Sequence, residues 1–318
     1  MKHLLDRRFL LVAGKGGVGR TTIATALARA AASLGKRVLL AQTHAPERLG
    51  RLLGSASAIG TTVTAVDERL FAVNMDPKVA LHEYGVMVLK YESLYRALFE
   101  NKPMRSFLGA FPGLDYWSML GKAWWHTTER MNGRRKYDLV ILDGPASGHA
   151  VAMLRIPDAV QQAMPKGPLA RDAALARAML SDASQASVVL VTLPEELPAR
   201  ETMTLARDLR ALGIPHGPLV VNGMPPAGAG DPSVEGILAA SAGAEPPSAL
   251  AGLLAGTVVL AARRRDAERI VAGLVGDPGL SMLQLPRLPT NDLGPEEIAL
   301  LADLLADTSL AKPPASSP

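Results

Sequence analysis

Short apolar runs alternate with longer, alanine-rich segments along most of the chain. An apolar run that ends in glycine, aspartate or asparagine is typical of a buried parallel strand, and the longer segments have helical spacing. The expected strands are 9–13, 37–41, 70–75, 137–142, 187–193, 219–221 and 281–285; the expected helices are 21–33, 148–155, 158–182, 198–212 and 295–306. This alternation predicts an α/β fold with one doubly wound, mostly parallel sheet and helices on both faces.

Residues 76–132 interrupt the alternation. They carry most of the aromatic residues, show helical spacing over 79–99 and 114–131, and contain no obvious strand. We therefore expect an α-helical insertion within a single domain that covers residues 1–306. The Pro, Gly and Ala content of 223–248 predicts a loop with one short helix, and the tail 307–318 is expected to be disordered.

Composition excludes several kinds of site. The 318 residues include no cysteine, so disulfides, thiolate zinc sites and thiol nucleophiles are excluded. The net charge of +4 is not gathered in one long run, so no nucleic-acid partner is expected. The two densest basic patches, 134–136 and 263–265, are interpreted as solvated helix ends.

The same sequence predicts a cytoplasmic protein with no integral membrane segment. The charged residues 1–8 lead through one apolar run directly into a glycine loop, which is unlike a signal peptide. The longest apolar window, 249–262, is too short to span a bilayer.

A glycine-rich loop follows the first expected strand and opens the first expected helix, which is the setting of a phosphate-binding P-loop. Its glycines let backbone N–H groups surround phosphate oxygens, and the helix N-terminus favours the anion. Thr21 is placed to ligate Mg²⁺, and Arg20 stands where the Walker pattern has lysine, keeping the charge on a longer, forked group. The predicted phosphate-binding residues are Gly14, Lys15, Gly16, Gly17, Val18, Gly19, Arg20, Thr21 and Thr22.

A second candidate site lies at the end of the strand 137–142. Asp143 follows this strand, where a carboxylate can hold the water shell of Mg²⁺. Thr21 and Asp143 are therefore the predicted metal-binding residues, with ATP and Mg²⁺ as the predicted cofactors.

The motifs resemble those of a known family. The stretch Lys-Gly-Gly-Val-Gly-Arg-Thr-Thr at 15–22 resembles the signature-lysine P-loop of the ParA, MinD, nitrogenase iron protein and ArsA group. Asp143, then Ser-Gly-His at 147–149 and Leu-Arg-Ile-Pro at 154–157, is similar to switch II of the ArsA ATPase family. The segments 191–202 and 285–289 resemble later blocks of this family, and 112–115 resembles the start of its helical subdomain.

This resemblance implies roles for individual residues. Lys15 would reach phosphates across a dimer, and Gly148-His149 would sense the γ-phosphate and relay its presence to the helical insertion. Glu201 or the acids before it would face the nucleotide or the dimer partner. Asn222 would read the adenine edge, and Pro286 would lie in a loop beside the base.

Two positions depart from the family pattern. His44 falls where the family has the aspartate that orients the attacking water, and Arg20 replaces the usual lysine. A neutral histidine can accept a hydrogen bond from water, so the predicted catalytic residues are His44, Asp143 and Lys15, with slower hydrolysis expected.

Three hypotheses about function remain open. The first is a dimeric Mg-ATP-dependent ATPase that handles a protein client; the lack of cysteine excludes a thiolate metalloid site. Met and Trp residues of the insertion would then either line a hydrophobic groove or form its core: Met87, Met104, Met119, Trp117, Trp124 and Trp125. The second is a nucleotide-binding regulatory subunit in a heterodimer with a lysine-containing paralogue. The third, a ParA/MinD-like positioning ATPase, ranks last because the proline-rich tail cannot form a membrane-binding helix.

Overall fold

A central sheet of eight strands organises the protein in the computed structural model, which describes residues 2–43, 48–89, 113–226, 248–274, 280–290 and 292–307. The strands are β1 (Phe9–Gly14), β2 (Val38–Thr43), β3 (Thr64–Ala65), β4 (Leu70–Met75), β7 (Leu139–Ala146), β8 (Ala186–Thr192), β9 (His216–Met224) and β10 (Met282–Pro286). Their order is β10-β9-β8-β1-β7-β2-β4-β3. Every neighbouring pair is parallel except β3–β4. The predicted α/β fold with a mostly parallel sheet is confirmed.

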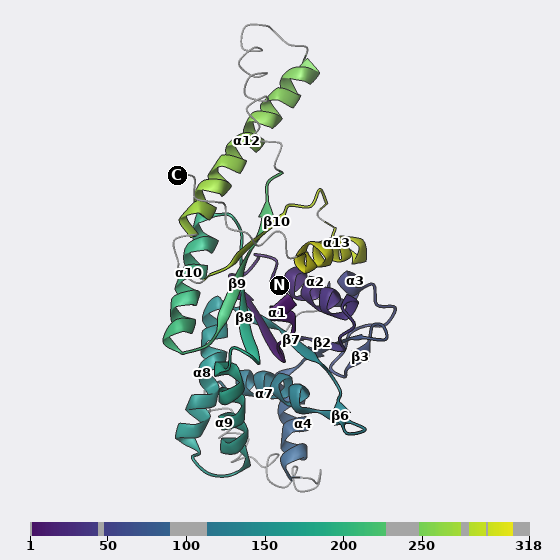
Figure 1. The fold of residues 1–318 in the computed structure, drawn as a ribbon, viewed down its shortest axis with the longest axis vertical. Coiled ribbons are helices and arrows are strands. Elements are labelled where there is room, and N and C mark those ends of the chain that lie inside the picture. The colour runs from purple at the N-terminus through teal and green to yellow at the C-terminus, as the bar shows by residue number, and fades with distance from the viewer. Residues whose placement is uncertain are drawn as a thin grey trace.

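Helices cover both faces of the sheet (Figure 1). One side carries α2 (Arg20–Ser33), α3 (Arg48–Leu53) and α13 (Pro295–Ala306), and the other carries α7 (Leu114–Thr128), α8 (Ser147–Ala163), α9 (Pro168–Ser181) and α10 (Glu196–Ala211). The short α1 (Lys2–Leu5) precedes β1. Because alternate side chains of a strand point to opposite faces, Leu11 joins one core cluster and Leu10 the other. Burial on both faces explains why the sheet strands are continuous apolar runs.

Within the expected insertion, the described residues form α4 (Pro77–Leu89) and α7, which pack against each other. The helix expected over 114–131 ends at Thr128 and is followed by a hairpin of β5 (Arg130–Met131) and β6 (Arg134–Arg135). Asn132 and Gly133, both at positive φ, form its two-residue turn. Asn-Gly is the preferred sequence of such turns. The interpretation of 134–136 as a helix end was therefore wrong.

Three of the Met and Trp residues that the sequence singled out in the insertion lie in the interior of the protein, and nothing is described for the side chain of Met87. Trp117, Met119 and Trp124 are buried, and Met119 and Trp124 belong to the core on the α7 side of the sheet. Met104 lies outside the described residues. Trp117 and Met119 therefore form part of the core.

The helix expected over 158–182 was also wrong. The expected boundary between the helices 148–155 and 158–182 lies inside α8, which contains Pro157. This helix ends at Ala163, and α9 begins at Pro168. A proline removes one hydrogen bond of the helix, and here burial of Ile156 and Val160 beside it offsets that loss.

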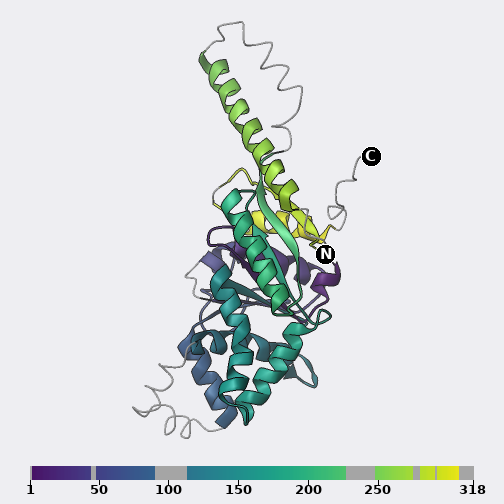
Figure 2. The ribbon, with the colours of Figure 1, turned by 90° about the vertical axis from the view of Figure 1, so that its left-hand side faces the viewer.

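A long helix was missed by the sequence pattern. Helix α12 (Ser248–Leu274) contains the apolar window 249–262 and extends away from the sheet (Figure 2). The arginines at 263–265 lie in its interior, so their interpretation as a helix end was wrong. No helix in the described part of the chain is long and apolar enough to cross a membrane. Most of the expected loop (227–247) and most of the tail (308–318) lie outside the described residues.

Candidate nucleotide site

The P-loop connects β1 to α2 at the carboxyl end of the central strand. Gly14 lies so close to β8 that a Cβ would stand 2.2 Å from the carbonyl oxygen of Val191. Gly19 has a φ of +90°, and a Cβ there would stand 2.4 Å from the amide nitrogen of Asn222. Gly16 and Gly17 are exposed at the tip. Close packing and left-handed backbone thus explain two of the glycines, and the tip stays open to an anion.

Three polar side chains meet beside this loop. Thr21 Oγ1 donates a hydrogen bond to Asp143 Oδ2 over 2.7 Å, and Gln42 Nε2 donates to the same oxygen over 3.3 Å. Parallel pairing of β2 with β7 places Gln42 directly opposite Asp143. Burial raises the pKa of Asp143, and hydrogen bonds from Thr21 and Gln42 together with the charge of Arg20 oppose that rise. The cluster is a buried group of oxygen atoms at the start of α2.

The oxygens of this cluster suit a hard divalent cation. Gln42 Oε1 is buried and accepts no hydrogen bond. Mg²⁺ takes oxygen ligands, commonly with only one or two carboxylates, and completes its shell with water and phosphate. The described residues contain no group of three or more His, Cys, Asp or Glu side chains that could hold a metal.

Arg20 turns toward the strand that carries Asp143. Its Nη1 donates to the backbone carbonyl of Gly144 over 2.6 Å. Burial lowers the pKa of Arg20, and the charge of Asp143 acts in the opposite direction. A guanidinium has several donors, so this bond ties α2 to the end of β7 and leaves other N–H groups for an anion.

Lys15 is held within the same chain. Its Nζ lies 2.9 Å from Glu201 Oε1, with both side chains partly exposed. Glu201 comes from α10, which begins near the end of β8 and so stands beside the loop. This ion pair occupies the one charge of Lys15.

Asn222 and Pro286 lie on a small pocket beside the loop. Asn222 Nδ2 donates to the carbonyl of Val18 over 2.9 Å, which ties β9 to the P-loop. A cavity of about 140 Å³ lies next to this contact. Its lining includes Thr22, Asn222, Pro286, Arg287 and Leu288. The pocket therefore combines an amide, a guanidinium and apolar side chains.

The segment after Asp143 touches α7. His149 Nδ1 is hydrogen-bonded to the hydroxyl of Tyr116, and their ring centroids are 5.8 Å apart. Gly113, which precedes α7, packs so tightly on Ile156 of α8 that a Cβ would stand 2.3 Å from its Cδ1. The start of α8 and the start of α7 are thus in direct contact.

Comparison with known proteins identifies the family. The sequence profile described as Anion-transporting ATPase, ArsA ATPase, matches residues 7–171 and 168–236, which is more than half of the chain. The chain belongs to this ATPase family. The predicted membership is confirmed, and the match covers the P-loop, Asp143, Glu201 and Asn222.

Relatives with other names support the same membership of the ArsA ATPase family. The ATPase BagA of Mycobacterium tuberculosis is 30% identical over 301 residues, covering 88% of this chain and 86% of that protein. An arsenical pump-driving ATPase of Escherichia coli is 29% identical over 69% of this chain and 40% of its own length. The ATPase ASNA1 homolog 1 of Paramecium tetraurelia is 26% identical over 52% of this chain.

The predicted site residues of this ArsA-family chain lie together with one exception. The P-loop, Asp143, Asn222 and Pro286 all lie at the carboxyl edge of the sheet, whereas His44 lies outside the described residues. Sequence reasoning missed Gln42 and Tyr116. Gln42 stood out only as a polar residue at the end of an apolar run, and nothing local marked Tyr116 as a partner of His149.

Proposed function

We propose that this chain binds Mg-ATP and hydrolyses its terminal phosphate. The observation that carries the proposal is the hydrogen-bonded pair of Thr21 and Asp143 at the mouth of an open P-loop. Thr21 would ligate Mg²⁺ directly, and Asp143 and Gln42 would hold its water shell. When bound, Mg²⁺ would supply positive charge that offsets the negative charge developing during phosphoryl transfer.

The residues around the phosphates would divide the remaining work. Backbone N–H groups of residues 14–22 would hold phosphate oxygens, and the guanidinium of Arg20 would supply a positive charge beside them. Adenine would lie beside Asn222 and Pro286, where the amide oxygen of Asn222 could accept a hydrogen bond while its nitrogen bonds the carbonyl of Val18. His44 orients the attacking water in this proposal.

Hydrolysis would be coupled to a dimer. Lys15 exchanges its partner Glu201 for phosphate oxygens of the opposite protomer when two chains close around nucleotide. The contact between His149 and Tyr116 offers a route from the γ-phosphate to α7 and so to a protein client. Such closure is a two-state rearrangement that the nucleotide biases.

Arg20 favours a second candidate function. A hydrogen bond to Gly144 holds its guanidinium. This group is larger and more delocalised than the ammonium of the lysine in a Walker loop, which supplies a compact point charge. In this alternative the chain binds nucleotide without turning it over and regulates a lysine-containing paralogue in a heterodimer.

Single-turnover hydrolysis with enzyme in excess separates the two functions. We expect phosphate release from the native chain and its loss in both variants. Thr21→Ala removes the proposed Mg²⁺ ligand, and Asp143→Asn removes the carboxylate that would hold the water shell of the ion. Ser33→Ala, at the exposed far end of the same helix, is the matched control. Nucleotide binding without phosphate release would refute the hydrolase and support the regulatory subunit.

Light scattering in the presence of a non-hydrolysable ATP analogue tests the proposed dimer. Lys15→Ala is expected to prevent the dimer. Glu201→Gln is expected to strengthen it about two- to fivefold, since an exposed ion pair contributes roughly 0.2–1 kcal/mol. Glu196→Gln, in the same helix but paired with Arg200, is the control. Unchanged association in Lys15→Ala would contradict a role for Lys15 across the interface.

A further inference from the structure

A second pocket lies at the amino edge of the sheet, opposite the P-loop. Arg8 directly precedes β1 and Gln185 directly precedes β8, and both line it. The end of α7, the β5–β6 hairpin and α9 form the other walls. Its volume is about 490 Å³, within the range of small-molecule sites. Nothing in the proposed nucleotide chemistry uses this cavity.

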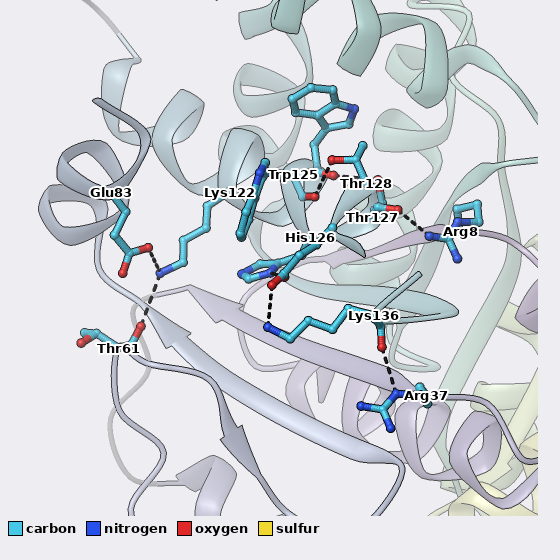
Figure 3. A network of polar contacts seen from close by, with 12 residues as sticks. Arg8, Arg37, Thr61, Glu83, Lys122, Trp125, His126, Thr127, Thr128 and Lys136 are labelled. Carbon is cyan, nitrogen blue, oxygen red and sulfur yellow. Dashed lines mark hydrogen bonds and ion pairs between the residues drawn. The ribbon is translucent and has the colours of Figure 1, made fainter. Parts of the chain in front are cut away.

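Arg8 is the fixed cation of the pocket. Its Nη1 donates to the carbonyls of Tyr137 and Asp138. Its Nη2 donates to the carbonyl of Thr127 at the end of α7 (Figure 3). These bonds hold the guanidinium plane while leaving Nε uncommitted among the described residues. Burial, then the charge of Arg135, lowers the pKa of Arg8 to about 10; Arg130 adds to this and Asp138 opposes it. The positive charges of Arg135 and Arg130 therefore both act on Arg8.

The pocket lacks matching negative charge. In the described part of the chain, neither Arg130 nor Arg135 forms a salt bridge with a carboxylate, and Arg130 instead donates to the carbonyl of Gly133. Asp182 is the one acidic residue among the described lining residues, and both of its oxygens already accept hydrogen bonds from Ser184 and Gln185. Three arginines and one aspartate leave this lining with a net charge of +2.

The opposite wall is apolar. Trp124, Leu175 and Met179 face the same cavity, and Leu175 is 49% exposed. Guanidinium groups pair with phosphate oxygens through two parallel hydrogen bonds, and a phosphate monoester carries nearly two negative charges at neutral pH. We propose that this pocket binds a small organic phosphate monoester, with the phosphate on Arg8, Arg130 and Arg135 and its apolar part on Leu175 and Met179.

Calorimetric titration of the full chain with phenyl phosphate at low salt tests the proposal. We expect binding with a Kd below about 1 mM, weakened about tenfold in Arg135→Ala and in Arg130→Ala, since each removes a charged hydrogen bond. Both arginines are exposed, so neither variant should impair folding. Arg134→Ala is the matched control, because this arginine lies on the same hairpin but outside the lining.

Two further titrations distinguish binding in this pocket from binding at the P-loop. Inorganic phosphate is expected to bind more weakly than phenyl phosphate, and saturating Mg-ADP should leave phenyl phosphate binding unchanged. Competition by Mg-ADP would assign the binding to the P-loop and overturn the proposal. Equal losses in Arg134→Ala and Arg135→Ala, or no binding at all, would overturn it too. The comparison of Arg134→Ala with Arg135→Ala tests the pocket even if the chain fails to bind nucleotide.

Discussion

The two edges of the central sheet both carry basic side chains, but these side chains have different partners at the two edges. At the carboxyl edge, Lys15 is paired with Glu201, and Arg20 lies beside Asp143 and bonds Gly144. At the amino edge, Arg8 bonds backbone carbonyls, and Arg130 and Arg135 stand near it without a carboxylate partner in the described residues. Basic side chains thus have neighbouring carboxylates at the carboxyl edge, whereas Arg130 and Arg135 have none among the described residues at the amino edge.

The difference shows how much local backbone geometry contributes to each edge. The carboxyl edge is built on glycine contacts and strand pairing that leave little freedom, and its cations have partners within the chain. The amino edge is built on side-chain hydrogen bonds that join the residue before β1, the end of α7 and the residues that flank the hairpin (Figure 3). At the carboxyl edge we therefore expect substitutions of glycine to have the largest effects on stability. At the amino edge we expect the main effects from substitutions that remove a charge.

The largest expected effect is that of Gly14→Ala at the carboxyl edge. A Cβ would collide with the backbone of Val191, which cannot move without disrupting β8. We expect a loss of about 2–3 kcal/mol in the free energy of unfolding, measured by urea denaturation. Gly16→Ala is the control, since nothing lies within 4 Å of its Cβ. Equal midpoints for the two variants would show that the close approach to Val191 is unimportant.

A smaller effect is expected for Arg20→Lys. Lysine loses the forked contact with Gly144 and supplies a compact charge to the phosphates, so we expect single-turnover hydrolysis to accelerate about tenfold, equal to about 1.4 kcal/mol. Arg29→Lys, in the same helix and paired with Asp67, should leave the rate unchanged. A slower Arg20→Lys enzyme would mean that the guanidinium itself is adapted to the reaction.

The smallest effect is expected at the amino edge, for Glu129→Gln. Burial raises the pKa of Glu129, but hydrogen bonds from His126 and Lys136 outweigh it and lower the pKa below 4.5. A lowered pKa means that the carboxylate stabilises the fold above pH 4.5 and loses that contribution as pH falls through the folded-state pKa.

We therefore expect Glu129→Gln to cost about 1 kcal/mol at pH 7, and the difference from the native chain to shrink in acid. Thermal unfolding at several pH values measures this. Glu196→Gln, which removes an exposed pair with Arg200, should change stability less at every pH. A difference that grows as the pH falls would contradict the role assigned to Glu129.

Local sequence signals predicted the sheet and the phosphate loop well. Buried parallel strands are apolar runs, so β1, β4, β7 and β8 were recognised within a few residues. The Asn-Gly turn at 132–133 was an equally local signal, and it could have predicted the β5–β6 hairpin. Pro157 misled the prediction because packing of α8 compensates a lost hydrogen bond, and that packing cannot be read from spacing.

The amino-acid sequence by itself determined the family and the glycine loop and singled out Thr21 and Asp143, because each depends on residues that are neighbours in the chain or on one strand's pattern. Only the tertiary structure decided that Glu201 holds Lys15, that Gln42 stands opposite Asp143, and that three arginines share one pocket. Those partners come from separate elements, and strand order and helix packing bring them together.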